Sequence, residues 1–380
     1  MNLDLSPDQV AIRDMVREFA SREIAPVAAR HDRTREFPHE NVRKCAELNL
    51  MGVMVPEEYG GSGLDTVSYA LIVEELSRAC ASTGVIVSVN NSLFLHPVEK
   101  FGNEEQKRRF LPPHARGEKL GCYCLSEPNA GSDAGNQETT AVRKGEEYIL
   151  NGTKNFITNG VAADTALVFA STDRSKKTQG VTAFLVERGT PGFRLGKDEV
   201  KMGITCSGSV EMVFEECRVP VQNRLGEEGK GFKIAMNTLD GGRIGIAAQA
   251  VGIARAALEE STRYSRDRKA FGKAIGEFQA IQFMLADMAT EVDAARLLTH
   301  RAAWAKDRGG RYSLEAAEAK LFASEVAMRA AVKGVQIFGG YGYMNEYPME
   351  RYLRDAKITE IYEGTSEIQR LVIAGNLLKD

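Results

Sequence analysis

The chain has 380 residues, which at roughly 150 residues per domain is enough for two or three domains. Its 49 lysines and arginines nearly balance 52 aspartates and glutamates, and a net charge of −3 gives no electrostatic ground for nucleic-acid binding. With 43% hydrophobic and 27% charged residues, the composition is that of an ordinary globular protein and excludes disordered and collagen-like chains.

The N-terminal ten residues contain neither a basic segment nor an apolar one, and no apolar run reaches the roughly 18 residues that a membrane helix needs. We therefore expect a cytoplasmic protein. The six cysteines are sparse, and Cys122 and Cys124 have a spacing that matches neither a zinc site nor a C-x-x-C redox pair. Buried free thiols are the expected state of these cysteines.

Residues 6 to about 120 have a helical pattern. Ser6, Pro7 and Gln9 form a capping signal, which predicts that the first helix begins at Pro7. Turn-forming prolines and glycines between 56 and 63 interrupt the helices, and the helical pattern resumes after them. The pattern predicts an N-terminal helical domain.

Between about 120 and 225 the sequence changes to short runs of β-branched and aromatic residues. We predict strands at 148–150, 166–170, 181–186 and 210–214. The pair Asn151–Gly152 lies between two extended segments and is typical of a tight hairpin turn. These features predict a small sheet or barrel.

Beyond Gly241 the helical period returns and continues to the end of the chain. Apolar positions recur at helical spacing over 244–258, 281–295 and 314–335, which predicts three long amphipathic helices. With a last helix at 366–378, the simplest arrangement is an antiparallel bundle. We find no internal repeat.

The common catalytic motifs are missing from the sequence. It contains no G-x-G-x-x-G, P-loop, H-E-x-x-H or G-x-S-x-G motif, which disfavours a Rossmann enzyme, a metalloenzyme and a triad hydrolase. The histidines have no metal-binding spacing; they are His31, His39, His96, His114 and His300. Turns rich in glycine and hydroxyl residues at 125–133, 157–160 and 338–342 can present backbone N–H groups to anions, although each is by itself more often only a loop.

Two groups of charged residues are ambiguous from spacing alone. Arg266, Arg268 and Lys269 end a helix, where they also suit the helix dipole. Glu363 stands just before a helix start at Gly364–Thr365, where a carboxylate is commonly only a capping or dipole partner. Both interpretations of Glu363, capping residue and catalytic carboxylate, stay open at this point.

Taken together, several segments resemble the acyl-CoA dehydrogenase family across essentially the whole chain. The resemblance is carried, in order, by 125–133, Phe156–Thr158, 268–272, 336–340 and 362–365. It implies an α+β multidomain fold with an N-terminal helical domain (1–120), a middle β-barrel domain (121–230) and a C-terminal four-helix bundle (231–380). It also implies a homotetramer with one FAD per subunit.

By this resemblance Glu363 is the general base, which removes the α-proton of an acyl-CoA thioester while the β-hydrogen leaves as hydride to the flavin. The product is a trans-2-enoyl-CoA, and the electrons pass to an electron-transfer flavoprotein. A positioned carboxylate supplies about 10² to 10⁴-fold of rate by proton transfer. The resemblance also places the backbone N–H of Glu363 on the thioester oxygen, where it stabilises the developing enolate.

The resemblance assigns FAD contacts residue by residue. Phe156 stands where many relatives have tryptophan, and its ring can still stack on a flavin. Arg268 and Gln279 would reach the FAD of a neighbouring subunit, together with the segment that begins at Gln336. The full set of expected FAD contacts is Tyr123, Leu125, Ser126, Ser132, Phe156, Ile157, Thr158, Arg268, Phe271, Gln279, Gln336, Gly339, Gly340, Thr365 and Glu367.

For the acyl-CoA, the resemblance assigns Ser132, Asp240, Gly241, Gly242, Arg243, Tyr362 and Gly364. Isovaleryl-CoA and long-chain relatives carry their base where this chain has Gly242, so Glu363 is the only candidate at either location, which disfavours isovaleryl-CoA. Gln249 and Thr359 resemble the short-chain members, in which bulk at these places shortens the acyl pocket. Butyryl-CoA is therefore the expected substrate.

Asn91 and His96 leave a branched or alicyclic acyl-CoA, such as cyclohexanecarboxyl-CoA, as an alternative, because His96 stands where short-chain relatives usually have a smaller residue. A His96 turned away from the pocket is an equal alternative. An oxidase that passes electrons to oxygen also fits this fold. A non-catalytic FAD or nucleotide-binding scaffold is disfavoured by the intact Glu363, and a thioesterase by the lack of a nucleophile and base pair.

Overall fold

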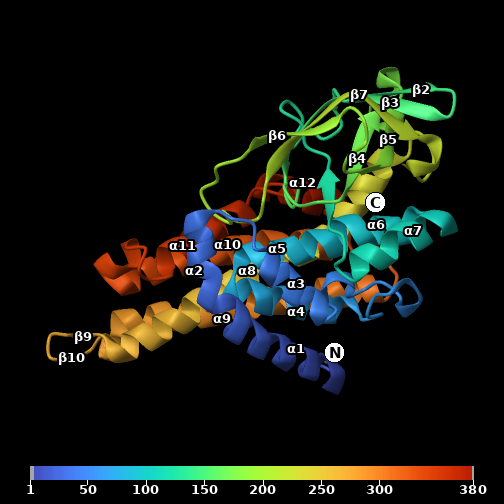
Figure 1. Cartoon of the computed structure of the whole chain (residues 1–380). Helices are drawn as coiled ribbons and strands as arrows, with labels where there is room; N and C mark the ends of the chain where they lie inside the picture. Colours follow the sequence, from blue (N-terminus) through green and yellow to red (C-terminus); the bar gives the residue numbers. More distant parts are fainter. Residues whose placement is uncertain (1–3, 379–380) are drawn as a thin grey trace.

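The structure is a computed structural model, and it describes residues 4–378. A β domain lies on one side of a thick layer of helices, and the N-terminal and C-terminal helices share that layer (Figure 1). The helical N-terminal part, the β domain and the C-terminal bundle expected from the resemblance are confirmed. The expected domain boundaries stay predictions; they fall between α7 and β1 and directly before α8.

The first helix begins where the capping signal predicts. Ser6 is the N-cap, its hydroxyl accepts from the Gln9 backbone N–H at 3.2 Å, and the Gln9 side chain accepts from the Ser6 N–H at 2.9 Å. The helices of this part are α1 (Pro7–Phe19), α2 (Ala25–Thr34), α3 (His39–Glu47), α4 (Thr66–Ala79), α5 (Ala81–Ser88), α6 (His96–Phe101) and α7 (Glu104–Ala115). A π-helical segment, η4 (Val89–Leu95), joins α5 to α6.

The β domain is a single sheet. Its strands are β1 (Gly121–Cys124), β2 (Thr140–Lys144), β3 (Glu147–Ile157), β4 (Thr165–Ser171), β5 (Val181–Glu187), β6 (Phe193–Asp198), β7 (Val210–Pro220) and β8 (Arg224–Leu225). They are ordered β6-β7-β3-β2-β4-β5-β8, and β1 pairs with β4 in parallel. All four strands predicted from the sequence are present, inside β3, β4, β5 and β7.

The predicted hairpin turn at Asn151–Gly152 is wrong. β3 runs straight through both residues, and the turn that reverses the chain is at Gly145–Glu146, between β2 and β3. Gly152 instead marks a register shift against β7, with φ of 150°. A Cβ on Gly152 would stand 2.6 Å from the Thr139 Cα, so the glycine is needed there for close backbone approach rather than for a turn.

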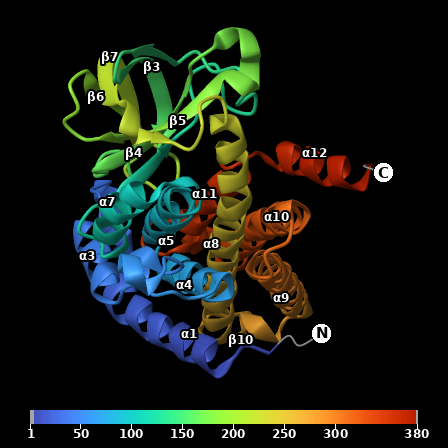
Figure 2. The same cartoon turned by 90° about the vertical axis from the view of Figure 1, so that its right-hand side faces the viewer.

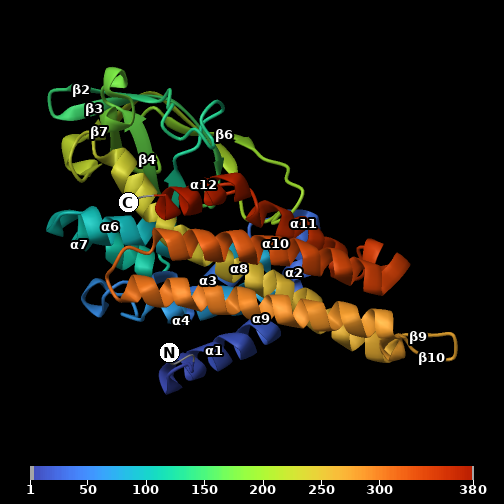
Figure 3. The same cartoon turned by 180° about the vertical axis from the view of Figure 1, so that it is seen from behind.

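The C-terminal part contains the three long helices that the periodicity predicts, and two shorter ones. They are α8 (Gly231–Asp267), α9 (Gln279–Asp307), α10 (Ser313–Phe338), α11 (Met349–Thr359) and α12 (Ser366–Leu377), with a short hairpin of β9 (Lys269–Ala270) and β10 (Lys273–Ala274) between α8 and α9. Helix α11 was not predicted. Figure 3 shows α9 and α10 side by side, with the β9–β10 hairpin extending from the end of the helical layer that lies away from the β domain.

Helix α8 occupies the centre of the helical layer. It packs against α10 and α9 from the C-terminal part and against α4 from the N-terminal part (Figure 2). One hydrophobic core therefore includes residues from both ends of the chain, such as Leu71 and Ile246. The stretch from Gly241 to Ala254 is buried on all sides, so this helix is less amphipathic than its sequence suggests.

Two further expectations concern the whole chain. All six cysteines are buried and free, as predicted. Among residues 4–378, no helix has both the length and the apolar character that crossing a bilayer requires.

Candidate active site

Glu363 lies in a tightly held turn after α11. Its φ of 54° is left-handed, which is uncommon for a residue other than glycine, and Gly364 follows with φ of 97°. The Gln369 amide donates to the carbonyls of Glu363 at 3.2 Å and Gly364 at 2.8 Å. Lys320 of α10 also donates to the Gly364 carbonyl, at 2.7 Å. These contacts fix the backbone that carries the Glu363 side chain.

The Glu363 carboxyl is buried without being neutralised by a close partner. Its Oε2 atom has no hydrogen-bond partner in the described part of the chain. Burial raises the pKa of Glu363 to about 8, although the positive charges of Lys320 and Arg243 act in the opposite direction. A buried carboxyl with a pKa near neutrality and a free oxygen is suited to accept a proton from a bound molecule.

Gly242 of α8 makes room for this carboxyl. A Cβ on Gly242 would stand 2.0 Å from Glu363 Oε2 and 2.7 Å from the Leu93 side chain. Any side chain at position 242 would therefore collide with the base. In the sequence, Gly242 was of interest for another reason: it stands where some members of the family carry their catalytic carboxylate.

The carboxyl lies at a cleft between the β domain and the helices. The β domain contributes Tyr123 of β1, Leu125, Ser126 and Ser132 of the following loop, and Phe156, Ile157 and Thr158 at the end of β3. The helical layer contributes Val89 and Leu93 of η4, Met236, Leu239 and Arg243 of α8, and Tyr362, Gly364 and Ile368 around Glu363. The structure thus brings together seven of the predicted FAD contacts and the predicted base.

A buried ion pair supports the loop that contains Ser126 and Ser132. Lys154 of β3 lies 2.6 Å from Glu127, and both side chains are almost completely buried. Lys154 also donates to the Leu125 carbonyl at 3.2 Å, while Glu127 accepts the backbone N–H of Thr139 at 3.1 Å. Sequence reasoning missed this pair, because its two residues are 27 positions apart and meet only when β3 packs against the loop.

Six of the remaining predicted FAD contacts lie away from the cleft. Arg268 and the Gly339–Gly340 turn line a separate surface pocket with Tyr341, and the Arg268 guanidinium lies 5.5 Å from the Tyr341 ring centroid. Phe271, at the tip of the β9–β10 hairpin, is 96% exposed, and Gln279 and Gln336 are exposed as well. None of these residues lines the cleft.

Thr365 and Glu367 begin the last helix. The Thr365 hydroxyl caps α12 by accepting the Ile368 N–H at 3.3 Å. Glu367 is exposed in the first turn of the helix. Both are close in sequence to Gly364, which lines the cleft, but neither contributes to the lining itself.

The predicted acyl-CoA contacts lie mostly at the cleft or behind it. Ser132, Arg243, Tyr362 and Gly364 line it. Asp240 pairs with Arg243 at 2.6 Å and also accepts the Ser313 hydroxyl. A Cβ on Gly241 would be in ordinary van der Waals contact, its nearest neighbours being the Lys306 ammonium at 3.5 Å and the Tyr312 hydroxyl at 3.6 Å.

Gln249 and Thr359 are both buried, and neither lines the cleft. The Gln249 amide donates to the Ala81 carbonyl at 3.0 Å and accepts the Tyr362 hydroxyl. The Thr359 hydroxyl donates to the Ala356 carbonyl at 2.7 Å. Gln249 thus fixes the position of an aromatic ring that lines the cleft.

The structure does not bring Asn91 or His96 to the cleft. The Asn91 amide accepts the Val53 N–H at 2.7 Å and donates to the carbonyls of Leu50 and Val87, so its hydrogen bonds join backbone segments. His96 faces α8 near Gly241, and burial with the nearby charges of Lys306 and Lys100 holds its pKa well below the usual value. The expected pocket-shaping role of these two side chains does not fit their positions.

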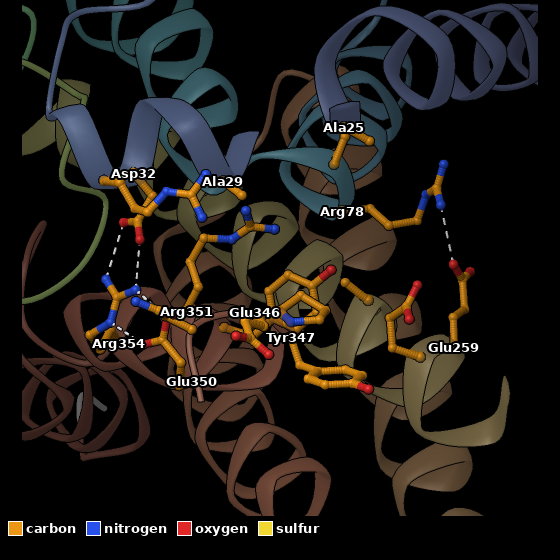
Figure 4. A pocket seen from close by; sticks show the side chains of 17 residues that line it. Ala25, Ala29, Asp32, Arg78, Glu259, Glu346, Tyr347, Glu350, Arg351 and Arg354 are labelled. Carbon is orange, nitrogen blue, oxygen red and sulfur yellow. Dashed lines mark hydrogen bonds and ion pairs between the residues drawn. The ribbon is translucent and has the colours of Figure 1, made fainter. Parts of the chain in front are cut away.

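A larger cavity lies elsewhere, among α2, α4, α8 and α11 (Figure 4). It is lined by ion pairs such as Asp32–Arg354 at 2.7 Å and Arg78–Glu259 at 3.2 Å. Arg351 points between them. None of the predicted site residues lines this cavity, so its size does not mark the active site.

Lys320 is a further candidate that sequence reasoning missed; it does not line the cleft but contacts the turn that carries Glu363. Its signal in the sequence is its place on the alanine-rich stripe of α10, where Ala316, Ala319 and Ala323 are buried on the same side. A lysine on such a stripe must be buried, and buried lysines usually have a specific partner.

Family models match the chain in three consecutive parts. The N-terminal, middle and C-terminal domains of acyl-CoA dehydrogenase match residues 6–118, 122–217 and 229–378. The short-chain specific acyl-CoA dehydrogenase of Clostridium acetobutylicum is 52% identical over 379 residues, with 100% of both chains covered. The chain belongs to the acyl-CoA dehydrogenase family.

Other comparisons give the same family. The mitochondrial short-chain specific acyl-CoA dehydrogenase of Mus musculus is 53% identical, covering 100% of this chain and 92% of that protein. The structure of butyryl-CoA dehydrogenase from Megasphaera elsdenii is 49% identical with a TM-score of 0.98, and both chains are fully covered. A chain in a structure described as the electron transferring flavoprotein of Acidaminococcus fermentans is 53% identical with a TM-score of 0.99, also with full coverage.

Acyl-CoA dehydrogenases are FAD flavoproteins, and this cleft suits a flavin. Phe156 has a left-handed φ of 61° and is 66% exposed, so a strained backbone presents an uncovered aromatic ring at the cleft. The Ser126 and Thr158 hydroxyls line the same cleft, and the Asn155 side-chain oxygen there is buried without a hydrogen-bond partner. A flat ring with polar edges would satisfy these groups.

Proposed function

We propose that this chain is a short-chain acyl-CoA dehydrogenase that oxidises butyryl-CoA to the trans-2-enoyl-CoA, with Glu363 as the general base. The observation that carries the proposal is the Glu363 carboxyl, which is buried at the cleft with a free oxygen and with Gly242 directly opposite. Support for the chain length comes from the names of the relatives, which are short-chain specific or act on butyryl-CoA.

The residues of the chain perform the proton transfer. Glu363 accepts the α-proton, and the electron pair of the broken Cα–H bond forms the double bond to Cβ. When bound, FAD supplies the two-electron acceptor for the β-hydrogen, which leaves with its electron pair as hydride. The Glu363 backbone N–H donates to the thioester oxygen and stabilises the enolate that develops. Leu93, Val89 and Tyr362 exclude water from the reacting carbons.

We assign residues to the flavin and to the acyl thioester from their places in the lining of the cleft. Leu125, Ser126, Ser132 and the segment Phe156–Thr158 would hold the flavin, together with Tyr123. Arg243, Tyr362 and Gly364 hold the acyl thioester. Gln249 limits the depth of the acyl pocket by fixing Tyr362. A linear short acyl chain is favoured over a branched or alicyclic one because His96 and Asn91 lie outside the lining.

The predicted FAD contacts that lie away from the cleft support an assembly of subunits. Arg268, Gly339 and Gly340 share a surface pocket that the cleft of the same subunit does not reach. In the proposed homotetramer these residues contact the FAD of a neighbouring subunit. An electron-transfer flavoprotein accepts the electrons, a role supported by the similarity to a chain in a structure described as the electron transferring flavoprotein of Acidaminococcus fermentans.

The test is the visible spectrum of the purified protein during anaerobic addition of acyl-CoA esters. We expect a yellow protein whose flavin absorbance bleaches fastest with butyryl-CoA, more slowly with longer chains and least with cyclohexanecarboxyl-CoA. Bleaching only with the cyclic ester would move the substrate to the alicyclic class. A protein that takes up no FAD would overturn the proposal as a whole.

A further inference from the structure

Lys320 is a completely buried lysine in the first half of α10. Its ammonium donates to the Gly364 carbonyl at 2.7 Å. Within the described part of the chain, no carboxylate lies within the 4.0 Å of an ion pair with it. Burying an unpaired charge costs free energy, and an apolar side chain of similar volume would pack there without that cost. Stability alone therefore does not account for a lysine at this position.

The contact of Lys320 is with the turn that carries the base. Gly364 directly follows Glu363, so the hydrogen bond to its carbonyl holds the backbone on which the carboxyl depends. Helix α10 approaches this turn from one side, and Gly242 of α8 approaches the carboxyl itself. Lys320 therefore supplies both a fixed hydrogen bond and a positive charge next to a carboxyl that has a free oxygen.

Lys320 and Glu363 affect the ionisation of each other. Burial lowers the pKa of Lys320 to about 8, and the negative charge of Glu363 partly offsets that shift. Burial raises the pKa of Glu363 to about 8, and among the charges that oppose the rise the positive charge of Lys320 is the larger. The charge of each group therefore acts on the ionisation of the other.

The other ionisable groups around Glu363 come from four elements. Arg243 of α8 is the second cation, but it is already paired with Asp240 at 2.6 Å. Tyr69 of α4, Tyr123 of β1 and Tyr362 of the same turn have raised pKa values, mainly from burial and in part from the negative charge of Glu363. The carboxylates that act on Lys320 besides Glu363 are Glu360 and Glu367.

We propose that Lys320 is a positioning residue for the catalytic base: from α10 it holds the Glu363–Gly364 turn through the Gly364 carbonyl, and its positive charge favours the carboxylate form of Glu363. The inference rests on the proposed function in one respect, the role of Glu363 as base. It adds a residue that contacts neither the substrate nor the predicted flavin contacts, and that acts through the Glu363–Gly364 turn.

The test compares Lys320→Met with the wild-type holoenzyme in the absence of substrate. Infrared absorption of the protonated Glu363 carboxyl is followed across the pH range around 8, and the band is assigned by its absence in Glu363→Gln. We expect the midpoint of this titration to rise by about one pH unit or more in Lys320→Met, because an opposing positive charge is lost. Thermal unfolding of Lys320→Met should occur at the wild-type temperature or above it, since the buried charge is gone.

A purely structural role predicts the opposite direction. If Lys320 only held the turn, its loss would loosen the turn, admit water and lower the Glu363 midpoint toward the ordinary carboxyl range. A lowered or unchanged midpoint in folded Lys320→Met overturns the proposal. Lys320→Arg keeps the positive charge, so its Glu363 midpoint should lie near that of the wild type. If Lys320→Met does not fold, Lys320→Arg alone is the test. A Glu363 midpoint raised by about one pH unit in Lys320→Arg would then overturn the proposal.

Lys306→Met is the matched control. Lys306 is a half-buried lysine on α9, and burial lowers its pKa to about 8 as well, but it is not among the charges that act on Glu363. Its loss should leave the Glu363 midpoint unchanged. Because the titration needs no substrate, it separates this inference from the proposed function: a wild type that no acyl-CoA ester bleaches would refute the function, whatever the titration shows.

Discussion

Glu363 Oε2 lies only 2.0 Å from the position that a Cβ on Gly242 would take. A helix residue and a residue 121 positions later in the chain are thus in such close contact that only glycine fits at the first. The relationship explains why α8 contains a glycine in a region that is buried on all sides, where alanine would favour the helix by about 1 kcal/mol.

Gly242→Ala should therefore damage catalysis more than folding. The added methyl group pushes the Glu363 carboxyl away from its position, and a displacement of about 1 Å costs about 10²-fold in rate. Stopped-flow measurement of flavin bleaching by butyryl-CoA checks this loss. Gly375→Ala is the control, because a Cβ there has no neighbour within 4 Å. A Gly242→Ala enzyme that bleaches at the wild-type rate would show that the close contact does not matter.

The rate of flavin bleaching should rise with pH up to about 8. Burial raises the pKa of Glu363 to about 8, so the carboxyl is protonated below that pH and cannot accept the α-proton. The rate should fall about tenfold per pH unit well below the midpoint, and it should level off above it. The check is the bleaching rate with saturating butyryl-CoA over this range. A rate independent of pH below 8 would contradict a base with this pKa.

Gln249→Ala should lengthen the accepted acyl chain. Its amide accepts the Tyr362 hydroxyl and donates to the Ala81 carbonyl, so its loss leaves space and releases the tyrosine. We expect the rate with hexanoyl-CoA relative to butyryl-CoA to increase about tenfold or more, the range for added methylene groups in an apolar pocket. His96→Ala, whose side chain lies outside the cleft lining, should keep the wild-type preference. An unchanged ratio in a folded Gln249→Ala variant would show that Gln249 does not limit the depth of the acyl pocket.

Arg268→Ala should weaken FAD retention without disturbing the cleft of its own subunit. The guanidinium lies in a surface pocket with Gly339 and Gly340, and in the proposed homotetramer it reaches the pyrophosphate of a neighbour. Loss of a charge-assisted bond of this kind costs about 1.5–3 kcal/mol, or roughly ten- to a hundredfold in affinity. Flavin content after gel filtration measures the loss. Arg266→Ala, in the same basic run, should retain its flavin, and equal retention by both variants would argue against a shared FAD site.

Local signals in the sequence predicted the elements well where the signal and the tertiary structure agree. The capping box at Ser6 and the strand at 166–170 are examples, since each is determined by residues close together in sequence. The resemblance also placed the residues of the cleft, because the segments at 125–133 and 156–158 meet in the fold. The fold class was therefore predictable from the sequence.

The failures occur where a local signal is overruled by a distant partner. Asn151–Gly152 has the composition of a turn, yet Gly152 is there because Thr139 of the neighbouring segment approaches its backbone. Lys320 has no local partner, since the carbonyl it binds lies 44 residues later. Asn91 looked like a pocket residue by position, but its amide is used by the backbone around Leu50. None of these relationships can be read from neighbouring residues alone.

The most direct test of the central claim is a single-turnover measurement on Glu363→Gln. The variant keeps the size of the side chain and removes the proton acceptor, while Glu360→Gln removes a carboxylate three residues away that pairs with Lys357 at 2.6 Å. With FAD bound and butyryl-CoA in excess, we expect Glu363→Gln to bleach at least about 10³-fold more slowly than the wild type and Glu360→Gln to bleach at nearly the wild-type rate. Bleaching of Glu363→Gln at the wild-type rate would contradict its role as the base.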